Sequence, residues 1–117
     1  MIDFVYGTLQ DKGIDYVVID VHGLGYKVFI PARLIADLPA EGKDIKLHSH
    51  YVVKEDLAEL YGFLSKMDRD IFRHLITVSG VGAKLGIKIL TGLACQEIIQ
   101  AIINKDIDSL TKVNGLG

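Results

Sequence analysis

The first half of the chain has the spacing of apolar and polar residues that is typical of short β-strands. Ile2, Phe4 and Tyr6 are separated by single positions, and several later segments are rich in β-branched and aromatic residues. The five expected strands are 2–6, 16–21, 26–30, 45–53 and 60–63.

Turn signals and one short link separate these strands. Gly7 is expected to end the first run, and turns are expected at 11–13, 23–25 and 41–43. Segment 31–39 begins and ends with proline and is expected to form a short helical or irregular link. Five short strands with a helical link between them favour a small closed barrel, of which the OB fold is the commonest design.

The apolar residues change to a helical spacing from Ser65 onward. Ser65 can cap a helix that runs to Ile76, because the apolar residues between them form one stripe. The later helices are expected at 84–90, at 95–104, and from Asp106 to just before Asn114. The sequence thus predicts an α+β chain, with an OB-fold barrel over 1–63 and a helix-hairpin-helix domain over 64–117.

Two glycines and a lysine lie between the first two expected helices. We call residues 79–84 the glycine turn; they are Ser79, Gly80, Val81, Gly82, Ala83 and Lys84. Glycine permits the positive φ that such a turn needs, and the unpaired N–H groups at the start of the next helix can bind a phosphate. Taken alone, this pattern also fits an ordinary turn between helices with a lysine at the surface.

A second copy of this pattern occurs later in the chain. The apolar and glycine positions of 72–82 match those of 107–117 at one constant offset, which indicates an internal repeat. The corresponding second turn consists of Asn114, Gly115, Leu116 and Gly117. Two such hairpins can bind phosphates on both sides of a minor groove without reading bases. Because no helix follows Gly117, we expect the sequence to be a fragment of a longer protein.

The charge is divided unevenly between the two predicted domains. Residues 1–63 contain six Lys and Arg against ten Asp and Glu, a net charge of −4, whereas residues 64–117 contain seven against five, a net charge of +2. The positive part is therefore the part with the hairpins. A single cysteine, no leader-like N-terminus and no long apolar run predict a cytoplasmic protein without a membrane partner.

No pattern in the sequence predicts a catalytic residue, a cofactor or a metal site. His48 and His50 share one strand face, but no carboxylate cluster of the two-metal type accompanies them. A phosphate-binding loop for ATP is also missing from the sequence, so any motor must be another protein. Glu55 and Asp56 lie at the tip of a predicted hairpin, where they are either simply solvated or act as a wedge that repels phosphates.

Several short runs together resemble the RuvA family of bacterial Holliday-junction-binding proteins. They are 23–26 (Gly-Leu-Gly-Tyr), 51–56 (Tyr-Val-Val-Lys-Glu-Asp), 60–63 (Leu-Tyr-Gly-Phe) and 79–85 (Ser-Gly-Val-Gly-Ala-Lys-Leu). The likeness extends over the entire chain. The Lys-Glu-Asp turn followed by Leu-Tyr-Gly-Phe is specific to that family, whereas helix-hairpin-helix elements occur in many repair proteins.

The resemblance implies a non-catalytic homotetramer that holds a four-way DNA junction open for branch migration. It implies phosphate contacts from residues 80–84 and 114–117, and it assigns Glu55 and Asp56 to a central acidic pin. For the full-length protein it also implies a hexameric RuvB-type motor and a RuvC-type resolvase as partners. The family's C-terminal motor-binding domain is not in this sequence, so motor recruitment by this chain is not expected.

Other readings compete with this one. The chain could be an OB plus helix-hairpin-helix piece of a repair ligase or nuclease that grips duplex DNA without junction preference. A glycosylase of the helix-hairpin-helix type would need a catalytic aspartate or lysine in a larger helical domain, which the residues after Gly82 do not supply. The chain could also be a protein-interaction barrel without a nucleic-acid partner. In that case the similarity of the two glycine turns would be a coincidence.

Overall fold

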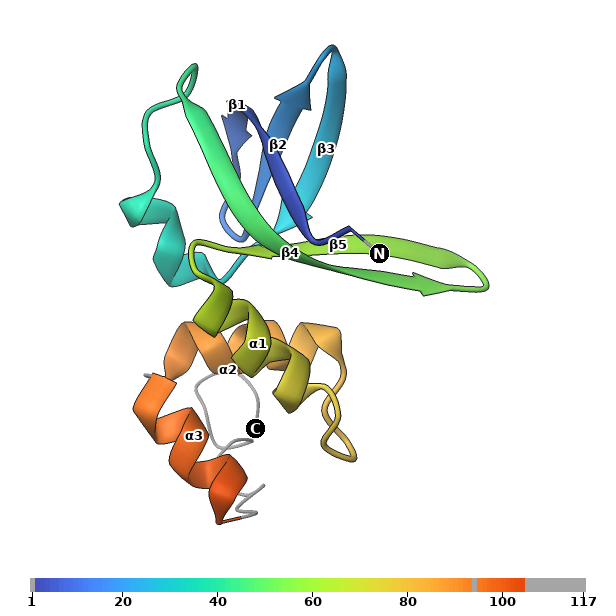
Figure 1. Ribbon diagram of the computed structural model, residues 1–117, viewed down its shortest axis with the longest axis vertical. Coiled ribbons are helices and arrows are strands. Elements are labelled where there is room, and N and C mark those ends of the chain that lie inside the picture. The colour runs from blue at the N-terminus through green and yellow to red at the C-terminus, as the bar shows by residue number, and fades with distance from the viewer. Residues whose placement is uncertain (1, 94, 105–117) are drawn as a thin grey trace. The chain divides into compact units, whose positions relative to one another are not determined.

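The computed structural model describes residues 2–93 and 95–104 and forms two compact units. One unit is Met1–Arg69 and the other is Asp70–Gly117, so the division falls within helix α1 (Lys66–Leu75). Figure 1 shows strands in the first unit and helices in the second.

The first unit is a closed five-stranded barrel with the strand order β1-β2-β3-β5-β4. Neighbouring strands are antiparallel, except that β3 and β5 are parallel. The strands are β1 (Phe4–Lys12), β2 (Tyr16–Val21), β3 (Leu24–Phe29), β4 (Asp44–Lys54) and β5 (Leu57–Phe63). This arrangement confirms the predicted barrel and, with the helices that follow, the α+β fold class.

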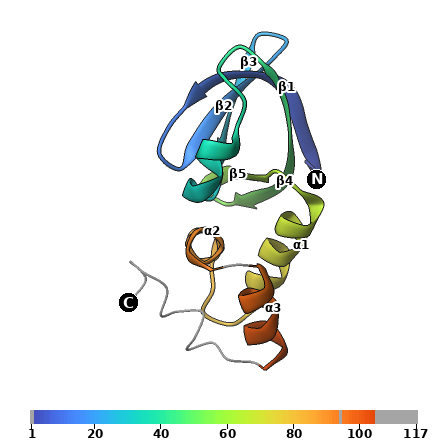
Figure 2. The same ribbon diagram turned by 90° about the vertical axis from the view of Figure 1, so that its left-hand side faces the viewer.

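The core of the barrel comes from the inward-facing positions of its strands. Leu9, Ile19 and Leu47 are fully buried members of one apolar cluster. The expected link after β3 is a short 3₁₀ helix, Ala32–Asp37, which closes one end of the barrel (Figure 2). Leu34 from this helix joins the same cluster, so the helix completes the core as well as the connection.

The prediction that Gly7 ends the first strand was wrong. β1 continues through Gly7 to Lys12 and contains an irregular register between Leu9 and Asp11. A Cβ atom at Gly7 would lie 2.4 Å from the carbonyl oxygen of Asp20 on β2. Glycine is therefore needed here for close approach of two strands, a use that local sequence cannot distinguish from a turn.

The reversal between β2 and β3 also lies earlier than predicted. His22 and Gly23 form the two-residue turn, with φ values of 53° and 88°, and Val21 pairs with Leu24. Positive φ at both positions is the geometry of a type I′ turn, whose twist matches that of the flanking strands. The backbone N–H of Gly23 donates to Oδ1 of Asp20 at 2.8 Å, which further fixes the turn.

Strands β4 and β5 extend past their other neighbours as a two-stranded ribbon. Pairing of β4 with β1 covers 44–48, and pairing of β5 with β3 covers only Leu60 and Tyr61. Pairing between β4 and β5 continues as far as Lys54 and Leu57. Among the described strands, 52–54 and 57–59 therefore have no neighbour except each other, and Figure 1 shows the ribbon projecting from the barrel.

Three helices follow the barrel, as predicted for this part of the chain. They are α1 (Lys66–Leu75), α2 (Ala83–Gly92) and α3 (Cys95–Ile103). The hydroxyl of Ser65 accepts a hydrogen bond from the backbone N–H of Asp68 at 3.1 Å, which confirms the predicted cap. None of these described helices is long and apolar enough to cross a bilayer. The helix expected from Asp106 lies outside the described residues.

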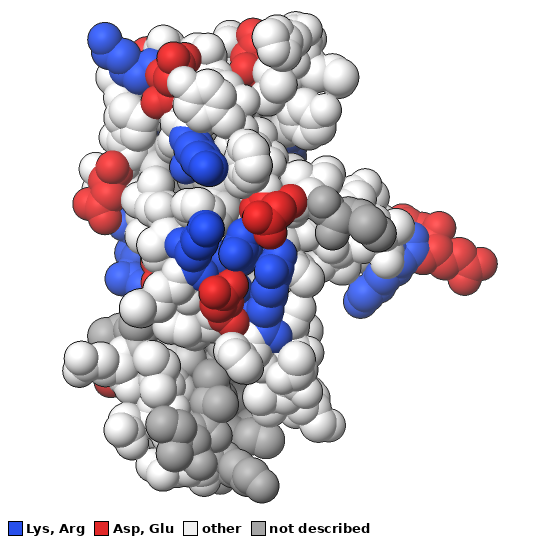
Figure 3. Space-filling model, viewed as in Figure 1, with Lys and Arg blue, Asp and Glu red and all other residues white. Residues whose placement is uncertain are grey.

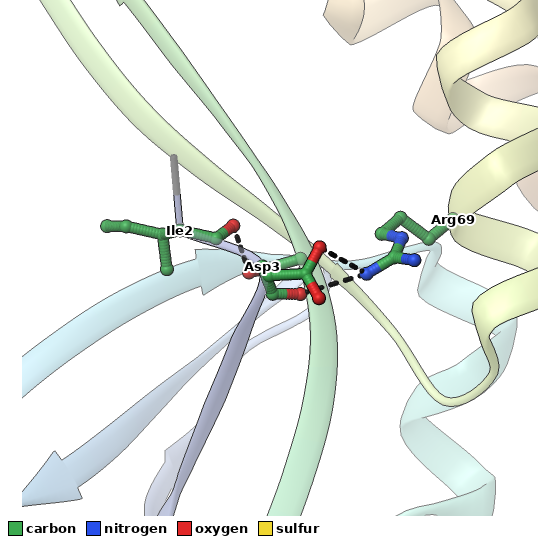
Figure 4. Close-up of polar contacts among 4 residues, drawn as sticks. Ile2, Asp3 and Arg69 are labelled. Atoms are coloured by element: carbon green, nitrogen blue, oxygen red, sulfur yellow. Dashed lines mark hydrogen bonds and ion pairs between the residues drawn. The ribbon is translucent and has the colours of Figure 1, made fainter.

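Within the first unit, Arg69 anchors the N-terminal segment of the barrel. Its Nη1 donates to Oδ1 of Asp3 at 2.9 Å and to the carbonyl oxygen of the same residue at 3.0 Å (Figure 4). Ser49 holds the same segment, because its hydroxyl donates to the carbonyl oxygen of Ile2 at 2.8 Å. The Arg69 side chain is 8% exposed and that of Asp3 is 64% exposed, so solvent partly screens the ion pair with the Asp3 carboxylate.

We expect Arg69→Met to lower the free energy of unfolding by about 2 kcal/mol, because it removes the guanidinium that donates two hydrogen bonds to Asp3. Asp3→Asn should cost less, since the bond to the carbonyl oxygen remains. Urea denaturation followed by far-UV circular dichroism measures both. Lys43→Met, at an exposed lysine, is the control, and an equal loss in that variant would contradict the anchoring role.

Candidate nucleic-acid interface

The connection between α1 and α2 is a tight turn that is closed by backbone hydrogen bonds. The N–H of Val78 donates to the carbonyl oxygen of Leu75 at 3.0 Å, and the N–H of Val81 donates to that of Val78 at 3.0 Å. The hydroxyl of Thr77 also donates to the carbonyl oxygen of His74 at 2.6 Å. These bonds satisfy groups at the C-terminus of α1 and define the path of the chain into α2.

Gly80 has a φ of 88°, in the left-handed region that favours glycine. Nothing lies within 4 Å of the position that its Cβ would occupy, so the backbone angle and not the space requires glycine. The next residue, Val81, is 5% exposed and anchors the turn in the apolar interior. The turn therefore keeps its backbone at the surface while one side chain holds it in place.

Helix α2 begins without a side-chain cap. Its N-cap residue is Gly82, which has no side chain to offer, and no acidic residue lies in the first turn. The first N–H groups of a helix have no partners within the helix, and they carry the positive end of its dipole. Lys84 adds a positive charge in the same turn and is exposed. The arrangement is suited to binding an anion such as a phosphate.

Gly86 contributes to this site indirectly, and sequence reasoning missed it. It is buried in α2, and a Cβ there would lie 3.1 Å from Phe72 Cε1 and 3.4 Å from Ile76 Cγ2. Glycine thus lets α2 pack closely against the end of α1. The signal in the sequence was a glycine inside an apolar helical pattern. Glycine weakens a helix, so its presence there indicates that close packing requires it.

The structure brings the six residues of the glycine turn together as one exposed loop and helix start. Ser79, Gly80, Gly82 and Lys84 are exposed, Ala83 is half-buried and Val81 is buried. Val81 is therefore a structural anchor, whereas the exposed backbone around it is accessible to a ligand. Asn114, Gly115, Leu116 and Gly117, which were predicted to form the second turn, lie outside the described residues.

Glu55 and Asp56 form the two-residue turn at the end of the ribbon. Both are exposed, and the last cross-strand pair before them is Lys54 with Leu57. Figure 3 shows acidic and basic side chains gathered at this projecting end. The turn belongs to the barrel unit and the glycine turn to the helical unit, so each is a separate candidate site.

The two histidines of β4 are not grouped with other metal-binding side chains in the part of the chain that the structure describes. Among the residues that the structure describes, no group of three His, Cys, Asp or Glu side chains is placed to hold a metal ion. Burial, with the nearby positive charges of Lys46, Arg69 and Lys66, lowers the pKa of His48 below its usual value. This histidine is therefore neutral at neutral pH and does not add to the positive charge around it.

Two protein-family models match the chain. Residues 1–62 match the family model described as the RuvA N terminal domain. The chain belongs to the RuvA family. Residues 72–117 match a second model, described as a SAM-like helix-hairpin-helix tandem. The RuvA match covers the barrel and the ribbon, and the tandem match covers the glycine turn and its predicted repeat.

Curated RuvA proteins align with the whole chain. It is 44% identical over 117 residues to the Holliday junction branch migration complex subunit RuvA of Pseudomonas fluorescens (strain SBW25). It is 42% identical to the protein of that name from Marinobacter nauticus and 39% identical to that from Pseudomonas aeruginosa strain PAO1. The alignments cover 100% of this chain but 58%, 56% and 58% of the three relatives.

Gly80→Ala should lower the free energy of unfolding by about 1–2 kcal/mol, because alanine is strained at positive φ. Gly82→Ala should change it by less than about 0.5 kcal/mol, since Gly82 has a φ of −89° and open space around it. Urea denaturation of the two variants compares them directly. Equal destabilisation would show that backbone conformation is not what requires glycine at position 80.

Proposed function

We propose that this RuvA-family chain binds four-way (Holliday) DNA junctions as a homotetramer and holds them open for branch migration. It acts as a non-catalytic DNA-binding subunit, and a separate ATP-driven motor moves the branch. The observation that carries the proposal is the uncapped, exposed N-terminus of α2 behind the glycine turn, in a chain whose barrel matches the RuvA N terminal domain. That site supplies the phosphate contact on which all DNA binding would depend.

The first hairpin would hold DNA through its phosphates and not through its bases. Backbone N–H groups and the positive end of α2 attract a phosphate oxygen, and Lys84 adds a long-range charge. Gly82 allows the DNA backbone to come close, because no Cβ intervenes. Such contacts position the protein on DNA with little sequence preference, which is what binding to junctions of any sequence requires.

The second hairpin would grip the same duplex arm. The internal repeat places Asn114, Gly115, Leu116 and Gly117 in register with the first turn, and the matched helix-hairpin-helix tandem extends over both. Two hairpins side by side can hold the two strands that flank a minor groove. Contact from both turns would therefore align the arm on the subunit.

Glu55 and Asp56 would act as an acidic pin at the branch point. The free-standing ribbon carries these two carboxylates away from the barrel, to a place where a DNA backbone could approach them. Like charge repels phosphates within about a Debye length, roughly 10 Å at 0.1 M salt. The pin would therefore keep the strands apart at the crossover and oppose its closure.

Fourfold symmetry would multiply weak contacts into tight binding. If each of four subunits neutralised about two phosphates, about eight counterions would be released and the slope of log K against log salt would be about −7. For the full-length protein we include a RuvB-type hexameric motor and a RuvC-type resolvase among the partners. The relatives' shared name, a subunit of a branch migration complex, supports that assignment.

Lys84→Glu should weaken binding to four-way junctions and linear duplex alike, by about tenfold or more, and should make the salt dependence shallower. Gly82→Ala should also weaken both, although it leaves the fold intact, because its methyl group would meet the phosphate. Gel-shift titrations at two salt concentrations measure these effects. Lys43→Glu, at an exposed lysine on the barrel, is the control. Unchanged binding by the Lys84 variant would contradict the phosphate site.

Glu55→Gln combined with Asp56→Asn should preserve or tighten DNA binding and reduce the preference for a junction over a duplex. Loss of two negative charges removes repulsion of phosphates, so affinity for both DNAs rises and the difference between them narrows. Competition between junction and duplex in one titration reports the preference. Asp37→Asn with Glu41→Gln, at exposed carboxylates of the same barrel unit outside the ribbon, is the control. A fall in affinity for the pin variant would refute the pin.

A further inference from the structure

The end of the β4–β5 ribbon is apolar on both of its faces. Val53 is 62% exposed and Leu57 is 36% exposed, and Ala58, opposite Val53, is exposed as well. Polar side chains would be the usual choice for a ribbon of two strands in water. These apolar residues lie directly beside the acidic turn of Glu55 and Asp56.

The exposure follows from the geometry of the barrel. Cross-strand partners point to the same side, and side chains alternate along each strand. Val53 and Ala58 therefore continue the face of Tyr51 and Leu60, which faces the barrel core. Beyond the barrel, the apolar core no longer covers this face of the ribbon, so its side chains are exposed. Leu57 lies on the opposite face, across from Lys54.

The charge of the ribbon end limits what can cover these residues. One lysine, Lys54, stands beside three carboxylates, those of Glu55, Asp56 and Glu59. Glu59 also accepts a hydrogen bond from the Tyr61 hydroxyl at 2.8 Å, which holds its carboxylate in place. The excess of negative charge disfavours contact with phosphates. On a DNA ligand, the largest apolar surfaces away from the phosphates are the faces of the bases.

Base faces are covered by stacking within a duplex and become accessible where stacking is interrupted. A four-way branch point is such a place, because stacking can be broken there between neighbouring arms. Apolar side chains such as leucine are known to insert between bases where a protein distorts DNA. An acidic and apolar ribbon end can therefore contact exposed base faces at an opened branch point. A continuous duplex offers it mainly phosphates, which it repels.

We propose that Val53 and Leu57 contact the faces of unstacked bases at the branch point and stabilise its open form. This inference rests on the proposed function and adds a second role to the ribbon. Glu55 and Asp56 repel the backbone, and the two apolar side chains replace part of the stacking that the bases lose. Together the four residues would stabilise an open crossover, because the carboxylates repel its phosphates and the apolar side chains contact its bases.

The test uses the whole chain and four-way junctions that carry 2-aminopurine either beside the branch point or in the middle of one arm. Fluorescence of this base rises when it unstacks. Saturating wild-type protein should raise the signal at the branch point and leave the arm signal unchanged. Val53→Thr with Leu57→Ser should remove about half or more of that rise, while junction affinity by gel shift changes by less than about threefold.

Two control variants separate the contact from general effects on the barrel. Ile14→Ser changes an 85% exposed apolar residue between β1 and β2, away from the ribbon, and should leave the fluorescence rise intact. Val53→Ile with Leu57→Met keeps apolar side chains on the ribbon and should also preserve the rise. Far-UV circular dichroism compares the folding of all the variants.

The outcomes distinguish this inference from the proposed function. A full fluorescence rise in the Val53 and Leu57 double variant, or an equal loss in Ile14→Ser, would overturn the base contact and leave junction binding standing. Loss of the rise together with loss of junction affinity would also overturn it, because the residues would then act in binding and not in opening. Failure of the wild-type chain to bind junctions would overturn both proposals.

Discussion

Unequal strand pairing within one closed barrel is the constraint on which the acidic turn depends. β4 is joined to β1 over 44–48 and β5 to β3 at only two positions, yet β4 and β5 continue to pair as far as Lys54 and Leu57. The barrel can close because every strand has two neighbours over part of its length. The ends of β4 and β5 that extend beyond this pairing form the ribbon. A two-stranded ribbon is only marginally stable by itself, so continuity with the barrel is what maintains its shape.

The two units carry opposite kinds of exposed surface. The helical unit offers an exposed N-terminus of α2, which follows the Gly80 turn and has no side-chain cap and no acidic residue in its first turn. The barrel unit offers carboxylates and apolar side chains at the ribbon end. Attraction alone would favour any duplex, because every duplex has phosphates. A repulsive element beside the attractive ones can discriminate between DNA shapes, since specificity depends on what is disfavoured as well as on what is bound.

Much of this fold was predictable from local sequence, and the exceptions share a physical cause. The strand periodicity, the Ser65 cap and the glycine turn are read from neighbouring residues, and the structure confirms them. Gly7 was misread as the end of a strand because its role depends on Asp20 in the adjacent strand. The bond from Arg69 to Asp3 joins residues 66 positions apart, and the ribbon follows from the registers of several strands. These features require the tertiary arrangement, which local patterns do not contain.

A gel-shift titration of this chain against a four-way junction and a linear duplex of equal length, at two salt concentrations, tests the central claim most directly. The account predicts tighter binding to the junction at both concentrations, with affinity for both DNAs falling as salt rises. Equal affinity for the two DNAs would contradict it. The ribbon would then not distinguish a junction from a duplex, and the hairpins alone would account for DNA binding.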